Sequence, residues 1–369
     1  MTHKLPYLAL RGIPGVGLVL FHRLIRAFGS PAAVFETAVP DLRSIKGVSP
    51  AIAQAIAGFR DWDRVEAQIS RVQAQGAEVY TLEDPEFPAG LKDIPYAPPY
   101  IFVKGTLEAG DHLAVAMVGT RTPSYYGVKT CRRLAGALAA RGLTVVSGLA
   151  RGIDTAAHLG ALENDGRTLA VLGCGLDVVY PPENRELYEK IPSQGALISE
   201  FPLGTPPEAR NFPIRNRLIS GLSLAVVVVE AGVRSGTSIT VDFALEQGRE
   251  VLAVPGPIDS PTSVGPHRLI QQGAKMVSSV EDILHELPGA WLEAGREAPA
   301  PFLAAPSRSL RMAADDPLLP FLGSDPIQLE ELVQAARLPA SEVMSRLTML
   351  ELQGLIRELP GKCYVLEAG

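Results

Sequence analysis

The sequence has few cysteines and no long hydrophobic run, and both absences narrow what the protein can be. Cys131, Cys174 and Cys363 are far apart and form no C-x-x-C pair, so neither a disulfide framework nor a zinc site is predicted. The longest uninterrupted apolar run covers residues 224–229, whereas a membrane-spanning helix needs roughly 20 residues. The amino terminus also lacks the charged and then apolar pattern of a signal peptide. We therefore expect a cytoplasmic protein without a membrane span, a metal or another cofactor.

Acidic residues outnumber basic ones, but the charge is unevenly distributed. The formal net charge of −6 argues against a general polyanion-binding surface. Residues 119–151 differ from the rest because they include no Asp or Glu. This stretch indicates a local anion site, although a solvated helix face explains three of its arginines (132, 133 and 141) equally well. Its basic residues are Arg121, Lys129, Arg132, Arg133, Arg141 and Arg151.

Residues 113–280 alternate between short apolar runs and helical stretches. The runs are too continuous for strands with one solvated face. The alternation predicts an α/β fold with a doubly wound, Rossmann-like parallel sheet covered by helices on both faces. The predicted strands are 113–119, 143–148, 168–173, 195–200, 224–230, 250–255 and 274–279, and the predicted helices are 124–141, 153–165, 185–191, 214–221, 235–248 and 264–272.

Two smaller domains are predicted beside this sheet, since 369 residues suffice for two or three domains. Near the amino terminus, Ile13–Gly17 and Ile45–Ser49 are glycine turns that each precede an amphipathic stretch, as in SAM-like helix-hairpin-helix modules. Such turns can bring backbone N–H groups to a phosphate, but a packing role is at least as plausible. The predicted domains are a helix-hairpin-helix domain (1–75), a Rossmann-like domain (76–287), a Pro- and Ala-rich linker (288–324) and a winged-helix domain (325–369).

The carboxy-terminal pattern of two helices and a hairpin is typical of a winged helix. Its second helix carries Arg346 against Glu342 and Glu351, whereas a helix that reads a DNA groove is normally more basic. We therefore favour a protein-contact role for this domain over weak contact with nucleic acid.

Five loops rich in Gly and Arg follow predicted strands. Ligands of doubly wound sheets bind beyond the carboxyl ends of the strands, so these loops are expected at one edge. Helices predicted to begin at Ile153 and Ser235 would offer free N–H groups to an anion, although Ser235 alone is equally an ordinary helix cap. Together the loops indicate a phosphate site. They are 118–122, 147–154, 172–184, 212–217 and 230–238.

Several enzyme classes lack their defining residues here. The sequence has no G-x-x-x-x-G-K-[ST] phosphate loop and no G-x-S-x-G nucleophile turn, and Gly173-Cys174-Gly175 lacks the third glycine of a dinucleotide site. Nucleotide phosphoribohydrolases carry a related G-G-x-G-T-x-x-E loop, but Thr240 stands where their acid/base Glu would be. A nucleotide-processing enzyme using the same loops remains the alternative function.

The motif set resembles the DprA (Smf) family of DNA-processing proteins. The resemblance covers about residues 80–285 and rests on MVGTR (117–121), SGLARGIDTAAH (147–158), VLGCGLDVVYPPEN (171–184), NFPIRNRLISGLS (211–223), VVVEAGVRSGTSITVDFALEQGREVLAVPG (227–256) and GPHRLIQQGA (265–274). The flanking helix-hairpin-helix and winged-helix segments match the family less specifically. One departure is Pro182, where many members have a basic residue.

The resemblance implies a protein that is not an enzyme. It would bind and protect incoming single-stranded DNA, load the RecA recombinase onto it during natural transformation, and form a homodimer through the Rossmann-like domain. Single-strand-binding protein is a further expected partner. A scaffold that mainly docks RecA, with secondary DNA contact, is a third hypothesis.

The resemblance and the loop chemistry together give a set of candidate DNA-binding residues. Arg121, Arg151 and Arg210 would pair with phosphates and Phe212 would stack on a base, as single strands require. Core packing of Phe212, and an internal ion pair of Arg215 or Arg217 with Glu200 or Glu230, are the alternatives. The candidates are Gly119, Thr120, Arg121, Ser147, Gly148, Arg151, Arg210, Phe212, Arg215, Asn216, Arg217, Ser235, Gly236 and Thr237.

Overall fold

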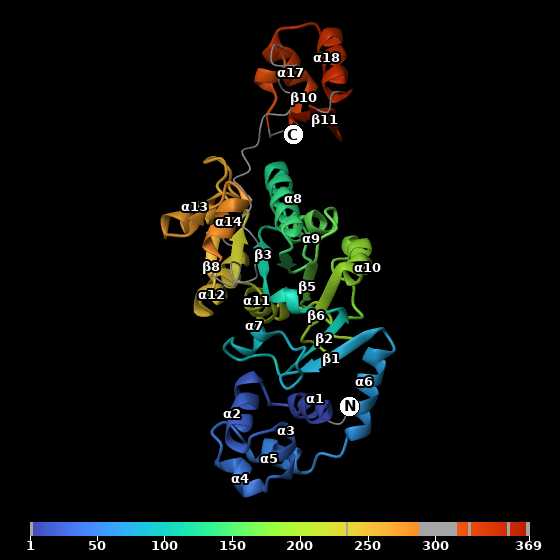
Figure 1. The fold of residues 1–369 in the computed structure, drawn as a ribbon, viewed down its shortest axis with the longest axis vertical. Coiled ribbons are helices and arrows are strands. Elements are labelled where there is room, and N and C mark those ends of the chain that lie inside the picture. Colours follow the sequence, from blue (N-terminus) through green and yellow to red (C-terminus); the bar gives the residue numbers. More distant parts are fainter. Residues whose placement is uncertain (1–2, 234, 288–315, 324–325, 353–354, 367–369) are drawn as a thin grey trace. The chain divides into compact units, whose positions relative to one another are not determined.

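A nine-stranded sheet lies at the centre of the larger of two compact units in this computed structural model (Figure 1). The structure describes residues 3–233, 235–287, 316–323, 326–352 and 355–366. The strands are β1 (Ala77–Thr81), β2 (Tyr100–Gly105), β3 (Ala114–Val118), β4 (Thr144–Ser147), β5 (Thr168–Leu172), β6 (Gly195–Ser199), β7 (Ala225–Val228), β8 (Glu250–Ala253) and β9 (Lys275–Met276).

The sheet confirms the predicted doubly wound architecture and adds an antiparallel edge. The strand order is β1-β2-β6-β5-β4-β3-β7-β8-β9, and the strands from β6 to β9 in this order are parallel. All seven predicted strands are present. At the edge, β2 pairs antiparallel with β6 and β1 pairs antiparallel with β2. Both edge strands lie within residues 76–287, the predicted range of this domain, and neither is among the seven predicted strands.

Helices cover both faces of this sheet, as predicted. Alternate residues of β5 enter different cores: Leu169 and Val171 pack with α11 and α12, whereas Ala170 and Leu172 pack with α10. All four side chains are buried, which explains why the strand is apolar at these four consecutive positions. The helices of this part are α8 (Tyr125–Ala140), α9 (Ile153–Leu162), α10 (Arg185–Gln194), α11 (Asn211–Gly221), α12 (Thr237–Glu246), α13 (Val264–Gln271) and α14 (Val280–Glu286), with α7 (Ala89–Lys92) before β2.

The direction of winding reverses at β3. From β3 the chain winds outward through β4 and β5 to β6, and it then returns to place β7 on the other side of β3. Two loops, one after β3 and one after β7, therefore diverge at this position and leave a crevice between them. Such a switch point is where doubly wound sheets bind their ligands.

The amino-terminal helices confirm the predicted helix-hairpin-helix fold. Gly15 and Gly47 occupy the centres of the two predicted turns with φ of +90° and +100°, a conformation that other residues adopt only with strain. After the second turn, the Ser49 hydroxyl accepts a hydrogen bond from the Ile52 N–H and caps the next helix. The helices are α1 (Lys4–Gly12), α2 (Leu18–Phe28), α3 (Pro31–Glu36), α4 (Val39–Ser44), α5 (Pro50–Ala57) and α6 (Trp62–Gln73).

The smaller unit has the predicted winged-helix pattern. Helices α17 (Leu329–Ala336) and α18 (Ala340–Leu352) accompany a three-stranded sheet of order β10-β12-β11. Its core extends before residue 325, because Leu318 and Leu322 are buried in it. Residues 288–315 of the predicted linker lie outside the described residues. The strands are β10 (Ile327–Gln328), β11 (Ile356–Leu359) and β12 (Cys363–Leu366).

The described residues include no helix that is both long and apolar enough to cross a membrane.

Candidate nucleic-acid interface

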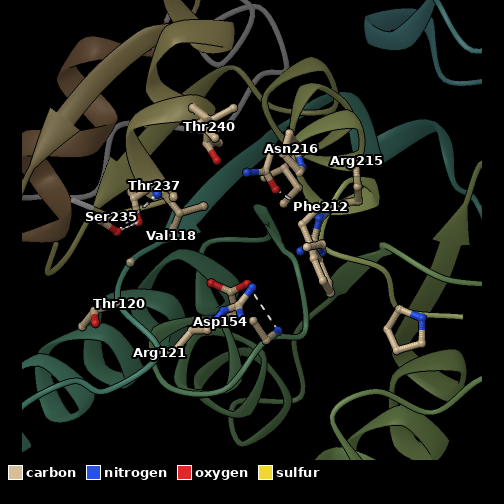
Figure 2. A pocket seen from close by; sticks show the side chains of 18 of the residues that line it. Val118, Thr120, Arg121, Asp154, Phe212, Arg215, Asn216, Ser235, Thr237 and Thr240 are labelled. Atoms are coloured by element: carbon tan, nitrogen blue, oxygen red, sulfur yellow. Dashed lines mark hydrogen bonds between the residues drawn. The ribbon is translucent and has the colours of Figure 1, made fainter. Parts of the chain in front are cut away.

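A pocket of about 710 Å³ opens at the switch point, where the loops after β3 and β7 diverge (Figure 2). Its wall comes from these two loops, from the loops after β4, β5 and β6, and from helices α9, α11 and α12. Arg121, Arg215 and Ser235 therefore line one cavity. The prediction that these loops together form a phosphate site requires this arrangement. The candidate residues that line it are Gly119, Thr120, Arg121, Phe212, Arg215, Asn216, Ser235, Gly236 and Thr237.

The loop after β3 is held against two neighbouring elements. The Thr120 N–H donates to the Glu230 carbonyl (2.7 Å), and the Thr120 carbonyl accepts from the Ile153 N–H (3.2 Å). A Cβ atom on Gly119 would lie 2.6 Å from Ile153 and 2.7 Å from the Glu230 carbonyl oxygen. Glycine is thus required here, and the tight loop sets the position of Arg121.

Phe212 lies among cations and another ring. The guanidinium of Arg121 is 5.2 Å from the ring centroid and that of Arg215 is 5.8 Å away, both within cation–π range. The Tyr180 ring lies at 5.7 Å with an interplanar angle of 39°. The phenyl ring also packs on Gly173, where a Cβ would approach it to 2.8 Å. Phe212 is half-buried, so it joins the pocket to the core instead of lying wholly in either.

Arg215 is the buried cation of the site, with 3% of its surface exposed. Its Nη1 donates to the carbonyls of Gly148 (2.5 Å) and Val171. Burial lowers the pKa of this guanidinium, and nearby Asp154 partly compensates. A side chain on Gly148 would occupy the place of this guanidinium, which explains the glycine.

Asp154 organises the loop after β4. Its Oδ2 accepts N–H groups from Gly148 (3.2 Å) and Ala150 (3.3 Å). Burial raises the pKa of this carboxyl, while Arg215 and the hydrogen bonds oppose the rise. Among the lining residues that the structure describes, Asp154 is the only carboxylate, and these bonds give it a positioning role.

The turn before α12 differs in detail from the prediction. The helix begins at Thr237, two residues after the expected start at Ser235. The Ser235 hydroxyl accepts the Thr237 N–H (3.2 Å) and donates to the Thr237 hydroxyl (2.9 Å). The Ser238 N–H donates to the Ser235 carbonyl (3.2 Å), so two N–H groups of the helix terminus are already bonded within the turn. Arg234 of this loop lies outside the described residues.

Two candidate arginines are exposed and do not line the pocket. Arg151 forms a surface ion pair with Glu183 (2.8 Å), and Arg210, whose side chain is 80% exposed, pairs with Glu208 (2.5 Å). Exposed pairs of this kind contribute little to stability, so their arginines can exchange the carboxylate for another anion.

Three candidates are placed inside the fold, away from the lining. The Ser147 hydroxyl is buried and donates to the Met117 carbonyl (2.7 Å), which joins β4 to β3. Gly148 makes room for Arg215. Arg217 is buried in an ion pair with Glu200, one of the two partners considered from the sequence. The structure thus assigns these residues contacts within the fold.

Tyr180 and Thr240 are among the lining residues that sequence reasoning did not select. Tyr180 could have been found, because it opens the Y-P-x-x-N motif in a loop already singled out. Thr240 was considered only as the position of a missing glutamate.

Three known domain families match the chain. The model of DNA recombination-mediator protein A matches residues 78–288, which is more than half of the chain. The chain belongs to this family. The DprA winged-helix domain matches residues 299–362, and the SAM-like helix-hairpin-helix tandem matches residues 7–57. All three predicted folds therefore have a family counterpart.

Relatives of the DprA/Smf family match along most of the chain. Protein Smf of Synechocystis is 34% identical over 97% of this chain and 97% of its own, and Protein Smf of Escherichia coli is 41% identical over 80% and 79%. The crystal structure of DprA from Streptococcus pneumoniae superposes with a TM-score of 0.65 at 34% identity, covering 78% of this chain and 98% of that one.

DNA processing protein A from Helicobacter pylori is a second structural relative. It matches with a TM-score of 0.52 at 28% identity over 58% of this chain and 96% of its own. That protein is described as having a unique single-stranded DNA binding mode.

Proposed function

We propose that this protein binds single-stranded DNA in the pocket at the switch point. The observation that carries the proposal is the position of Arg121, which is exposed at the pocket with its guanidinium over the Phe212 ring. A phosphate-pairing cation beside an aromatic ring is the combination that unpaired strands need. The single-stranded DNA binding described for the Helicobacter pylori relative supports the same assignment.

The strand would continue from the pocket to the two exposed arginines. Arg151 and Arg210 currently pair with surface carboxylates, and a DNA phosphate would replace these partners at little cost. The Ser235–Thr237 turn would hold a further phosphate through its remaining N–H groups. Arg215 is buried beside the Phe212 ring, where it would hold the ring in position and add positive charge to the pocket.

We further propose that DNA binding serves recombination during natural transformation. The protein would protect an incoming strand in the cytoplasm and load RecA onto it, acting as a homodimer through the Rossmann-like domain. Membership of the recombination-mediator family supports this proposal. The winged-helix domain would contact a protein, because its Arg346 is already paired with Glu342 and Asp316.

Binding without catalysis is favoured over nucleotide processing. Thr240 replaces the glutamate of the phosphoribohydrolase loop, and Asp154 is held by backbone N–H groups. Incubation with nucleoside monophosphates should release no base. Turnover that Arg121→Ala abolishes would reverse this preference.

A mobility shift with oligothymidylate tests the site. Arg121→Ala should weaken binding at least about tenfold, the effect of one charge-assisted contact. Arg133→Ala is the matched control, since Arg133 is exposed in the same basic stretch but does not line the pocket. Equal affinity of Arg121→Ala and the parent would refute the assignment.

RecA loading needs a separate measurement. RecA filament formation on strands coated with single-strand-binding protein should accelerate with the parent protein and much less with Arg121→Ala. Equal acceleration by both proteins would favour the scaffold hypothesis, in which DNA contact is secondary.

A further inference from the structure

A second pocket, of about 620 Å³, lies at the opposite edge of the sheet from the switch point. Residues that shortly precede parallel strands line it: His112 lies before β3, Leu224 before β7 and Arg249 before β8. The switch-point pocket instead follows the carboxyl ends of the strands. The two pockets share none of the lining residues that the structure describes, so a ligand in one leaves the other free. We refer to the second one as the basal pocket.

Apolar side chains form much of the wall of the basal pocket. Phe87 and Leu222 are buried and belong to the core of the sheet, whereas Leu107 and Leu224 are half-buried. A cavity of this size and character falls within the range of ligand sites. Its occupant therefore needs an apolar body.

Arg249 places a cation against this apolar wall. Its Nη2 donates to the carbonyls of Gly221 (3.2 Å) and Gly90 (3.4 Å), and both of these glycines line the pocket. Its Nε is buried without an acceptor, and no Asp or Glu in the described part of the chain pairs with it. The carboxyl end of α11 at Gly221 attracts the guanidinium but carries only a partial charge. The pocket thus contains a positive charge that is not fully compensated.

The surroundings of this cation exclude a polyanion. Glu86, Glu108 and Asp111 also line the pocket. Glu108 and Asp111 pair with Arg167 at 2.9 and 2.6 Å, whereas Glu86 forms no ion pair with the described residues. These carboxylates would repel a nucleic acid, but a single carboxylate can approach Arg249. The pocket therefore favours a ligand with an apolar body and one negative charge.

The basal pocket is open to solvent on one side. Glu86, Ala89, Ala109 and His112 belong to its lining and are exposed. An occupant can therefore extend beyond the pocket. A peptide needs this opening, because the rest of its chain must leave the site.

We propose that the basal pocket is a docking site for a partner protein, which inserts a short peptide with apolar side chains and one carboxylate. The apolar side chains pack against Phe87, Leu107 and Leu224, and the carboxylate pairs with Arg249. The inference goes beyond the proposed function and does not require DNA to be bound. It gives the protein a second binding site that a strand in the switch-point pocket does not cover.

The test uses two forms of the peptide Leu-Leu-Phe, one with a free terminal carboxylate and one with a terminal amide. Both carry the same fluorescent label at the amino terminus, and fluorescence anisotropy with the full chain measures their affinities. The parent should bind the carboxylate form at least about tenfold more tightly, the effect of one charge-assisted contact. Arg249→Gln removes the charge but keeps an N–H donor for the two carbonyls, and it should bring the two affinities within about twofold of each other. Arg249→Lys should keep part of the difference.

Substitutions at Ala89 test the site without altering Arg249. Ala89 is exposed in the lining and directly precedes Gly90, whose carbonyl accepts from the guanidinium. Ala89→Glu should weaken binding of the carboxylate form about threefold or more, and Ala89→Lys should strengthen it, because a nearby charge acts on the carboxylate. The amide form should respond to neither. Arg133→Gln is the matched control, since Arg133 is exposed and lines neither pocket.

Equal affinities of the parent for the two peptides would overturn the proposal, as would an absence of binding of the carboxylate form at about 1 mM. Phenylpropionate that displaces the labelled peptide as effectively as the unlabelled peptide does would also overturn it, because the occupant would then be a small acid. None of the Ala89 variants should change the affinity for oligothymidylate. Failure of the docking site therefore leaves the proposed function intact.

Discussion

At the scale of single residues, Arg215 and Arg217 show how one motif divides its side chains between a site and the fold. Both lie on α11 and both are buried. Arg215 lines the pocket and donates to the carbonyls of Gly148 and Val171, whereas Arg217 pairs with Glu200. Burial raises the pKa of Glu200 and lowers that of Arg217, while their mutual attraction opposes both shifts.

The Arg217–Glu200 pair predicts a stability effect that is separate from DNA binding. Arg217→Met leaves a buried carboxylate without its partner and should reduce the free energy of unfolding by about 3–5 kcal/mol. Adding Glu200→Leu removes that charge and should restore most of the loss, since apolar pairs often replace buried ion pairs without cost. Chemical denaturation measures both effects. The double variant should bind oligothymidylate like the parent, and a tenfold loss with stability restored would show that Arg217 contacts DNA.

His158 is a second buried group whose contacts define its protonation. The Thr168 hydroxyl donates to the Val145 carbonyl, so it accepts from His158 Nδ1 at 2.7 Å. Nε2 is buried and has no partner among the described residues. Burial, aided by the charge of Arg215, lowers the pKa of His158 to about 3. The imidazole is therefore neutral in the folded protein.

This histidine predicts a loss of stability in mild acid. Its pKa is lower in the folded chain than in the unfolded chain, where it is about 6.5. The unfolded chain therefore gains a proton first, and the free energy of unfolding falls by up to about 1.4 kcal/mol for each pH unit below 6.5, until about pH 3. Urea denaturation at several pH values measures this slope.

His158→Gln and His158→Asn separate the histidine from other titrating groups. The slope of the unfolding free energy against pH reports how many more protons the unfolded chain binds than the folded chain. Between roughly pH 6 and 4, this difference should be smaller by about one proton in each variant than in the parent, whatever the variant's absolute stability. Parallel curves for parent and variants would contradict a neutral buried His158.

At the scale of elements, the helix-hairpin-helix turns depend on backbone conformation. A Cβ on Gly15 would enter a strained conformation and lie 2.9 Å from Ile52. Gly15→Ala should therefore reduce the free energy of unfolding by about 1–2 kcal/mol. Gly12→Ala is the control, because Gly12 has free space around its Cβ position and no positive φ.

The same variant separates packing from phosphate contact in this domain. If the turn only packs, Gly15→Ala should bind oligothymidylate like the parent at a temperature where both are folded. A loss of affinity that exceeds the loss from Arg121→Ala would instead place DNA at the glycine turn.

Elements were more predictable from the sequence than the roles of side chains. Each buried strand of the parallel part of the sheet was visible as an apolar run, because a strand covered on both faces has no polar alternation. Strand β1 was missed since Glu78 and Tyr80 interrupt its buried positions. Arg217 could not be assigned from the sequence, because residues 215 and 217 lie about 200° apart on a helix. Burying both requires protein on two sides of α11, which only the tertiary fold supplies.

At the scale of the whole molecule, an acidic protein must bind a polyanion through few contacts. The net charge of −6 opposes a long electrostatic track along the strand. The exposed cations proposed to contact phosphates are Arg121, Arg151 and Arg210, and the last two already form ion pairs with surface carboxylates. Affinity must then depend on base contacts as much as on charge.

This balance predicts a shallow salt dependence. Each neutralised phosphate of a single strand contributes roughly 0.7 to the log–log slope, so three arginines give a slope of about −2. Fluorescence anisotropy with a short oligothymidylate between about 50 and 200 mM salt measures it. Arg121→Ala should reduce the slope by about 0.7, and Thr240→Val should leave it unchanged because a hydroxyl neutralises no phosphate. A parent slope steeper than about −4 would mean that the strand follows additional cations, and the pocket would then be only part of a longer path.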